Sequence, residues 1–278
     1  MKKTGRRFYR AGLVVAGLVA ATAVAEIAFS VRDEHAFPHL NTYVADSKLG
    51  VRLRPAGRTM VRFGSKENPI TRAEIGPEGY REPLPPPGAD DVLVVGDSQV
   101  FGLGVEASET FSHVLAEQLR GKPGWSEAQV LNLGVPTYGP DEYLAVLEEL
   151  LRTRRPRAIV VALNMVNDLF EASRPNAERH AVLDGWAVRK EHLIGTPWPI
   201  PYRYVLFGRS HLVYALRRQG EQGVLGAGVG VPSEGGYRDL LSAAADGVEA
   251  ERRVAEAHAL EIRDLSVEAN RAYLAFER

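Results

Sequence analysis

A serine directly follows a short apolar run, in a position where its hydroxyl could act as a nucleophile. Residues 92–98 read Val-Leu-Val-Val-Gly-Asp-Ser. The four apolar residues predict a strand that is buried on both faces, and Gly96 lets the backbone turn sharply after it. Ser98 then lies just past the carboxyl end of the strand, where catalytic groups collect in an open parallel sheet. Gly-Asp-Ser says little on its own, because these residues suit any turn or helix cap.

Two further apolar runs also end in polar residues. Residues 129–134 read Gln-Val-Leu-Asn-Leu-Gly, and residues 158–163 read Ala-Ile-Val-Val-Ala-Leu and lead into Asn164, Asn167 and Asp168. If the three strands are parallel, all three polar clusters lie at one edge of the sheet. Acyl transfer needs this combination, a hydroxyl nucleophile beside hydrogen-bond donors for the oxyanion of the tetrahedral intermediate.

Helical patterns separate the three predicted strands. One covers residues 110–120 and the other covers residues 141–154, where four leucines share a face. Strands that alternate with helices in this way predict an α/β fold with a parallel, helix-covered sheet.

These motifs resemble those of the SGNH/GDSL hydrolases, in particular the membrane-anchored bacterial branch, over residues 45–170. The matching residues, in the family's order, are Gly96, Asp97 and Ser98, then Asn132 and Gly134, then Asn167 and Asp168. The resemblance implies a flavodoxin-like parallel sheet with Ser98 as the nucleophile. It also implies an oxyanion hole made by the N–H groups of Ser98 and Gly134 and the side-chain amide of Asn167, with Gly96, Asp97, Asn132 and Asp168 in supporting roles. Met165 departs from the pattern, because many members have glycine there.

The resemblance also implies a substrate class. Members of this branch act on acyl groups, often acetyl esters on extracytoplasmic polysaccharides. We therefore expect an extracytoplasmic serine esterase that forms an acyl-enzyme on a cell-envelope glycan. An O-acyltransferase would use the same residues, and a non-catalytic binding or scaffold protein is the third alternative.

The family's C-terminal Asp-x-x-His, which supplies the general base and its orienting carboxylate, does not occur in this sequence. The seven histidines are His35, His39, His113, His180, His192, His211 and His258, and none stands in such a block. Residues 249–278 show one continuous helical pattern. The sequence thus suggests a C-terminally truncated member with little or no turnover, and divergence to a non-catalytic protein is the competing account.

Composition narrows the other possibilities. The 278 residues carry a net charge of −1 and contain no cysteine. The charge gives no electrostatic footprint for nucleic acid, and the lack of cysteine excludes disulfides and thiolate metal sites. No phosphate-binding loop or metal-binding motif occurs in the sequence, so we expect neither a cofactor nor a metal.

The N-terminal segment predicts a membrane anchor over residues 1–31. Five basic residues precede an apolar run from Ala11 to Ala25 that continues past Glu26 to Val31, which is about twenty residues and long enough to span a bilayer. The basic residues place the N-terminus in the cytoplasm and the remainder outside. The alternative is a signal peptide cleaved after Ala25, because residues 23–25 read Ala-Val-Ala.

The rest of the chain divides into an appendage and the main domain. Residues 32–90 predict a small β-rich appendage with a proline-rich linker at 83–87, and residues 91–278 predict the α/β domain. An insertion at 172–246 would either form a lid over the substrate or be a mobile surface loop.

Overall fold

The computed structural model describes residues 3–63, 67–164, 168–172, 174–190 and 202–221. The helices are α1 (Lys3–Arg32), α2 (Ser98–Phe101), α3 (Phe111–Arg120), α4 (Pro140–Leu150), α5 (Asp168–Glu171), α6 (Asn176–Arg179), α7 (Arg203–Arg209) and α8 (His211–Glu221), with one 3-10 turn, η1 (Ala107–Glu109). The strands are β1 (Tyr43–Asp46), β2 (Gly50–Leu53), β3 (Arg58–Arg62), β4 (Ile70–Glu74), β5 (Asp91–Val95), β6 (Gln129–Asn132), β7 (Ala158–Val161), β8 (His180–Leu183) and β9 (Trp186–Arg189).

The three strands expected from the apolar runs form one parallel sheet in the order β6-β5-β7. Leu93 of β5 pairs with Leu131 of β6 on one side and with Ile159 of β7 on the other. The first strand thus lies between the second and the third, which is how a flavodoxin-like doubly wound sheet begins. The expected α/β class is confirmed.

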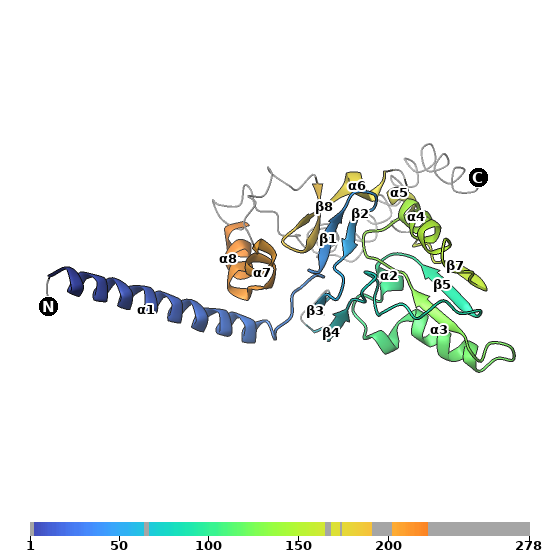
Figure 1. Ribbon diagram of the computed structural model, residues 1–278, viewed down its shortest axis with the longest axis horizontal. Coiled ribbons are helices and arrows are strands. Elements are labelled where there is room, and N and C mark those ends of the chain that lie inside the picture. The colour runs from blue at the N-terminus through green and yellow to red at the C-terminus, as the bar shows by residue number, and fades with distance from the viewer. Residues whose placement is uncertain (1–2, 64–66, 165–167, 173, 191–201, 222–278) are drawn as a thin grey trace, which may run out of the picture.

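Helices cover the two faces of this sheet, with α4 on one side of β5 and α3 on the other (Figure 1). On the α4 face, Leu93 and Val95 pack in one core with Tyr143 and Val146. On the opposite face, Val92 and Val94 belong to a second cluster, against which Leu115 and Leu119 of α3 pack. All five residues of β5 are buried, which explains why its sequence is apolar without alternation.

The appendage consists of two antiparallel hairpins, β1–β2 and β3–β4. A third hairpin, β8–β9, lies in the segment expected to be a lid or a loop. Its two-residue turn is Asp184-Gly185, with φ of 52° and 95°. Positive φ at both positions is typical of the type I′ turn, for which Asp-Gly is a favoured sequence.

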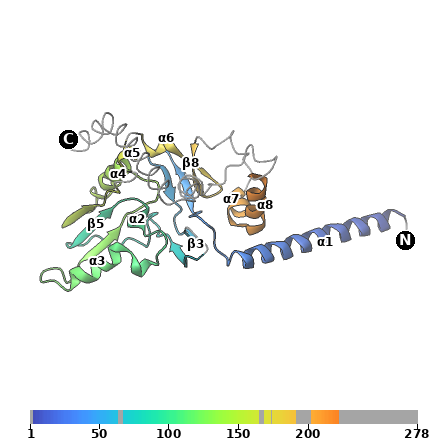
Figure 2. The same cartoon turned by 180° about the vertical axis from the view of Figure 1, so that it is seen from behind.

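The helix α1 extends from the folded domain, and α7 and α8 lie beside its C-terminal part (Figures 1 and 2). Within residues 8–32, an 18-residue window reaches a mean hydropathy of 2.1, and this stretch is long and apolar enough to cross a membrane. The apolar side chains along it are exposed, for example Leu18 and Val19 at 64% each.

One helix ends earlier than expected, and one short helix was not expected. The helix expected over 141–154 ends at Leu150, and Arg154 turns inward to pair with the buried Asp91 at 2.7 Å. Ser98 begins a four-residue helix, α2, that is too short to produce a periodic pattern. The helix expected over 249–278 lies outside the described residues.

Candidate active site

Ser98 is placed by a tight turn between β5 and α2. A Cβ on Gly96 would lie 2.3 Å from Val100 Cγ2, so a larger residue would force α2 away from the strand. Asp97 caps the helix, because its Oδ1 accepts a hydrogen bond from Gln99 N at 2.8 Å. Ser98 is half-buried, and its Oγ lies 3.5 Å from Asp97 Oδ2. Ser98 thus lies just past the carboxyl end of β5.

The Asn-Leu-Gly segment after β6 packs against this short helix. Asn132 Nδ2 donates to Val100 O at 2.8 Å, and Asn132 Oδ1 accepts from Gly134 N at 3.1 Å. A Cβ on Gly134 would lie 2.3 Å from Phe101 N, so only glycine fits there without a backbone shift. The Gly134 N–H already has a partner in Asn132, and its role as an oxyanion donor stays a prediction.

The segment after β7 completes the arrangement. Asn164 Nδ2 donates to Asp97 Oδ2 at 2.9 Å, and Asn164 N donates to Asp168 Oδ2 at 2.8 Å. Tyr143 OH of α4 donates to the same carboxylate at 3.0 Å. Hydrogen bonds therefore link the carboxyl ends of β5 and β7 beside Ser98. Asn167, the predicted oxyanion donor, lies outside the described residues.

Two carboxyl groups beside this network have raised pKa values. Burial, together with the nearby charge of Asp97, raises the pKa of Asp168 to about 6. Burial also raises the pKa of Glu171 to about 7, against the opposing effect of Arg179, whose Nη1 lies 2.9 Å from Glu171 Oε1. Titratable groups tuned in this way gather at catalytic sites, although structural ion pairs also produce them.

Arg81 binds the C-terminal end of α2, the helix that begins at Ser98, and the sequence analysis did not identify this residue. This arginine follows the β3–β4 hairpin and is 3% exposed. Its Nη1 donates to Phe101 O at 2.8 Å and to Gly102 O at 2.5 Å, and its Nη2 donates to Val105 O at 2.6 Å. A cation at the C-terminal end of a helix satisfies carbonyls that have no partner within the helix. The appendage thus fixes the position of Ser98, and no local signal around Arg81 indicates this.

The described histidines with assigned contacts have structural partners. His180 Nδ1 lies 2.6 Å from Asn176 Oδ1, and burial lowers the pKa of this imidazole to about 3. His211 Nδ1 lies 3.1 Å from Asp33 Oδ2, and its ring stacks on Phe37. His113 Nε2 lies 3.6 Å from Glu117 Oε1 on α3. His192 and His258 lie outside the described residues.

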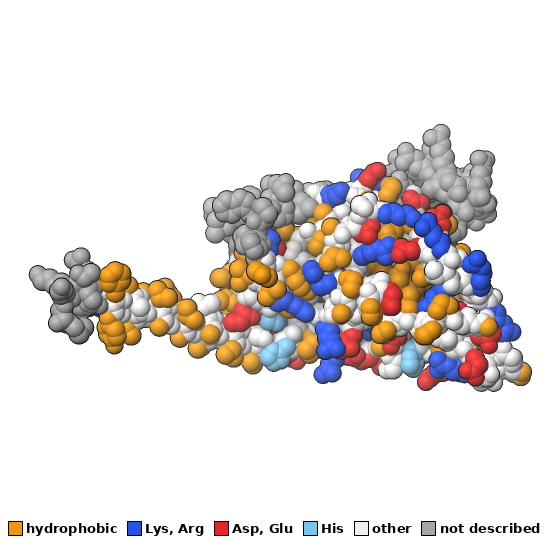
Figure 3. Space-filling model, in the orientation of Figure 1, with side chains coloured by type: hydrophobic (Ala, Val, Ile, Leu, Met, Phe, Trp, Pro, Cys, Tyr) orange, Lys and Arg blue, Asp and Glu red, His pale blue; other side chains and the backbone are white. Residues whose placement is uncertain are grey.

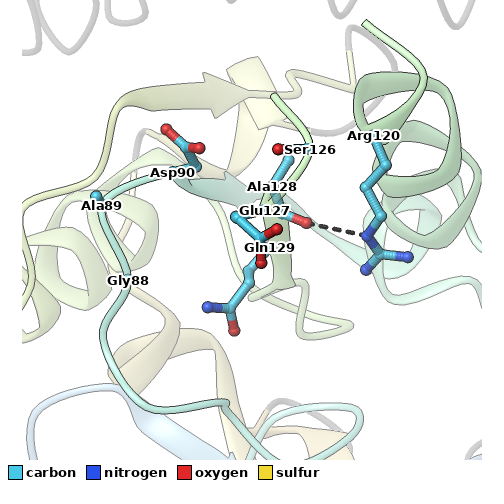
Figure 4. A pocket seen from close by; sticks show the side chains of 8 residues that line it. All are labelled: Gly88, Ala89, Asp90, Arg120, Ser126, Glu127, Ala128 and Gln129. Carbon is cyan, nitrogen blue, oxygen red and sulfur yellow. Dashed lines mark hydrogen bonds between the residues drawn. The ribbon is translucent and has the colours of Figure 1, made fainter. Parts of the chain in front are cut away.

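An open pocket of about 410 Å³ lies at the other end of the sheet. It is lined by residues that precede β5, such as Asp90, and by the segment that leads into β6, such as Ser126 and Glu127 (Figure 4). Arg120 Nε donates to Ala128 O at its wall, at 3.2 Å. Because this is the amino edge of the parallel strands, the pocket is separate from the Ser98 network. Among the described residues, no cluster of three or more His, Cys, Asp or Glu side chains could hold a metal ion.

Comparisons with known proteins add little to this geometry. No family model and no curated protein matches the chain. A solved structure described as AlinE4, a SGNH-hydrolase family esterase, aligns with 61% of this chain and 97% of its own, at 21% identity and a TM-score of 0.26. A variant of that esterase aligns with 58% of this chain and 95% of its own, at 19% identity and the same TM-score. A TM-score of 0.26 does not establish a common fold.

Proposed function

We propose that this chain is a membrane-anchored serine hydrolase of the SGNH/GDSL type that cleaves acyl esters outside the cytoplasmic membrane. One observation carries the proposal. Gly-Asp-Ser, Asn-x-Gly and the two residues Asn164 and Asp168 lie at the carboxyl ends of three adjacent parallel strands, and hydrogen bonds connect them around Ser98. The substrate class, an O-acetyl ester on a cell-envelope glycan, comes from the motif resemblance.

The proposed reaction uses Ser98 Oγ as the nucleophile. The oxygen attacks the ester carbonyl carbon, its proton passes to a general base, and the alcohol leaves with a proton. Water then attacks the acyl-enzyme and releases the carboxylic acid. Backbone N–H groups of Ser98 and Gly134 and the amide of Asn167 would hold the oxyanion, while Asp97 fixes the start of α2. Gly134 N–H would have to exchange its bond to Asn132 for the oxyanion.

A fluorophosphonate probe tests the nucleophile, because it labels activated serines covalently. Labelling takes one covalent attack and no turnover, so we expect slow labelling of the full chain even though its sequence has no Asp-x-x-His, and we expect Ser98→Ala to abolish labelling. Ser126→Ala is the matched control, because Ser126 is an exposed serine at the opposite end of the sheet. Labelling that persists in Ser98→Ala would refute the assignment. Peptide mapping of the labelled protein identifies the modified residue directly.

A non-catalytic binding protein is the second candidate, and two observations favour it. The sequence contains no Asp-x-x-His, and Gly134 N–H is already bonded to Asn132 Oδ1. An unlabelled wild-type chain that unfolds cooperatively would support this candidate over the hydrolase.

A further inference from the structure

We infer that helices α7 and α8 form a second membrane contact, in which their exposed apolar side chains enter the outer lipid–water interface beside the point where α1 leaves the bilayer. This inference rests on the membrane anchoring in the proposed function. It concerns a surface that the Ser98 site does not use.

The apolar face of α7 is exposed to solvent. Tyr202, Val205 and Leu206 are 85%, 62% and 54% exposed, and their spacing places them on one side of the helix. Leu216 of α8 is 57% exposed. Side chains of these two helices and of α1 appear as hydrophobic surface at the same end of the domain (Figure 3). Contiguous apolar surface of this kind marks a site of protein or membrane interaction.

The opposite side of α7 is bound to the domain. The helix is therefore firmly attached, and its exposed face has a fixed orientation. A Cβ on Gly208 would lie 2.1 Å from Asp184 O, and Asn41 Nδ2 donates to Gly208 O at 2.5 Å. Asp184, in the β8–β9 turn, pairs with Arg203 at 2.5 Å and with Arg217 of α8 at 2.8 Å. The fold therefore presents the apolar face outward in a defined orientation.

The start of α8 is bound to α1 at the level of Glu26. Glu26 Oε1 accepts a hydrogen bond from His211 N at 2.8 Å, and Oε2 accepts from Leu212 N at 3.1 Å and from Ser210 Oγ at 2.5 Å. The helix rises about 22 Å between Ala11, where the apolar run begins, and Glu26, which is most of the ~30 Å hydrocarbon thickness. Glu26 thus lies near the outer interface of the bilayer, and α8 starts there.

The chemistry of this surface favours phospholipid as the occupant. An exposed tyrosine beside exposed aliphatic residues is typical of helices that lie in the membrane interface. In both cartoon views, α7 and α8 are the part of the folded domain nearest the N-terminal half of α1.

Single cysteines with an environment-sensitive fluorophore test the contact, because the chain has no cysteine of its own. The full chain is reconstituted in vesicles of phosphatidylglycerol and phosphatidylcholine that carry a doxyl quencher near the headgroup. We expect probes at Leu206→Cys and Leu216→Cys to lose fluorescence to the quencher. A probe at Leu144→Cys is the matched control, because Leu144 is a 47% exposed leucine on α4, away from α1 in Figure 1.

A probe at Val15→Cys in α1, with doxyl groups deep in the acyl chains, reports the anchor separately. Quenching at position 15 with Leu206 and Leu144 equally unquenched would overturn the second contact and leave the anchor intact. No quenching at position 15 would overturn both. A blue-shifted but unquenched probe at position 206 would identify a second protein copy, in place of lipid, as the occupant.

Discussion

The carboxyl group of Asp168 combines deep burial with two strong hydrogen-bond donors. It is 1% exposed and accepts bonds from Asn164 N and Tyr143 OH through the same oxygen. Its other oxygen, Oδ1, has no partner among the described residues. Burial disfavours the charged form of Asp168, and the nearby negative charge of Asp97 adds to this effect. The pKa of Asp168 is therefore raised.

This shift predicts how stability depends on pH. The pKa of Asp168 is about 6 in the fold and 3.8 ordinarily, so the folded state binds more protons between these values. The stabilisation is fully present below the ordinary pKa and is lost as the pH rises through 6. We expect the free energy of unfolding of Asp168→Asn to exceed that of the wild type by about 3 kcal/mol at pH 8 and to match it at low pH. Urea titrations of the full chain in detergent at both pH values measure this.

Glu117→Gln, on the exposed side of α3, is the control for removing one carboxylate. A wild-type chain whose stability relative to Asp168→Asn does not change between the two pH values would contradict the prediction.

At the scale of elements, the packing of the Asn132–Gly134 segment on α2 limits what position 134 tolerates. A methyl group there would meet the backbone of α2, which cannot move aside as a side chain can. We expect Gly134→Ala to lower the free energy of unfolding by about 3 kcal/mol and to reduce labelling of Ser98. Gly121→Ala is the control, because its Cβ would meet only Gln118 O at 3.5 Å. Thermal unfolding of both variants decides; an equal melting temperature would contradict the prediction.

The sequence predicted the elements whose signal is local. β5 and β7 lie in apolar runs, and β6 contains the shorter apolar pair Val130-Leu131. The helix α3 begins at Phe111, one residue after the expected start at Thr110. The β8–β9 hairpin was missed although Asp184-Gly185 is a hairpin signal. The bonds of Arg81 to α2 and of Glu26 to α8 could not be predicted, because each joins segments that are distant in the chain without any pattern in either.

At the candidate site, the sequence predicted which strand ends come together but not which side chains bury Asp168. Ser98, Asn132 and Asp168 come together because parallel strands align their carboxyl ends. The burial that shifts the pKa of Asp168 depends on Tyr143 from α4 and on Asn164, which the motif did not single out. Local sequence therefore located the site but not its electrostatics.

At the scale of the whole molecule, α1 bears on whether the N-terminal segment is kept or removed. Residues 23–25, the alternative cleavage site, lie inside the unbroken helix Lys3–Arg32, whereas a peptidase binds its substrate in an extended form. We therefore expect the mature protein to keep residues 1–31 and to remain in the membrane fraction after alkaline extraction. Intact-mass measurement of the purified protein checks this, and a mass that begins at Glu26 would contradict it.

The bonds between Glu26 and the start of α8 also set an order of events during synthesis. The carboxylate and its donors are separated by 184, 185 and 186 residues. At ordinary ribosome speeds, α1 is made about 10 to 40 s before its partner helix. In the proposed anchored form, the carboxylate would meet water and lipid headgroups during that interval, and a charge there is costly unless it stays at the bilayer surface. The contact between Glu26 and α8 would then form only after α1 had entered the membrane, so the anchor would be the first part of this contact to be placed.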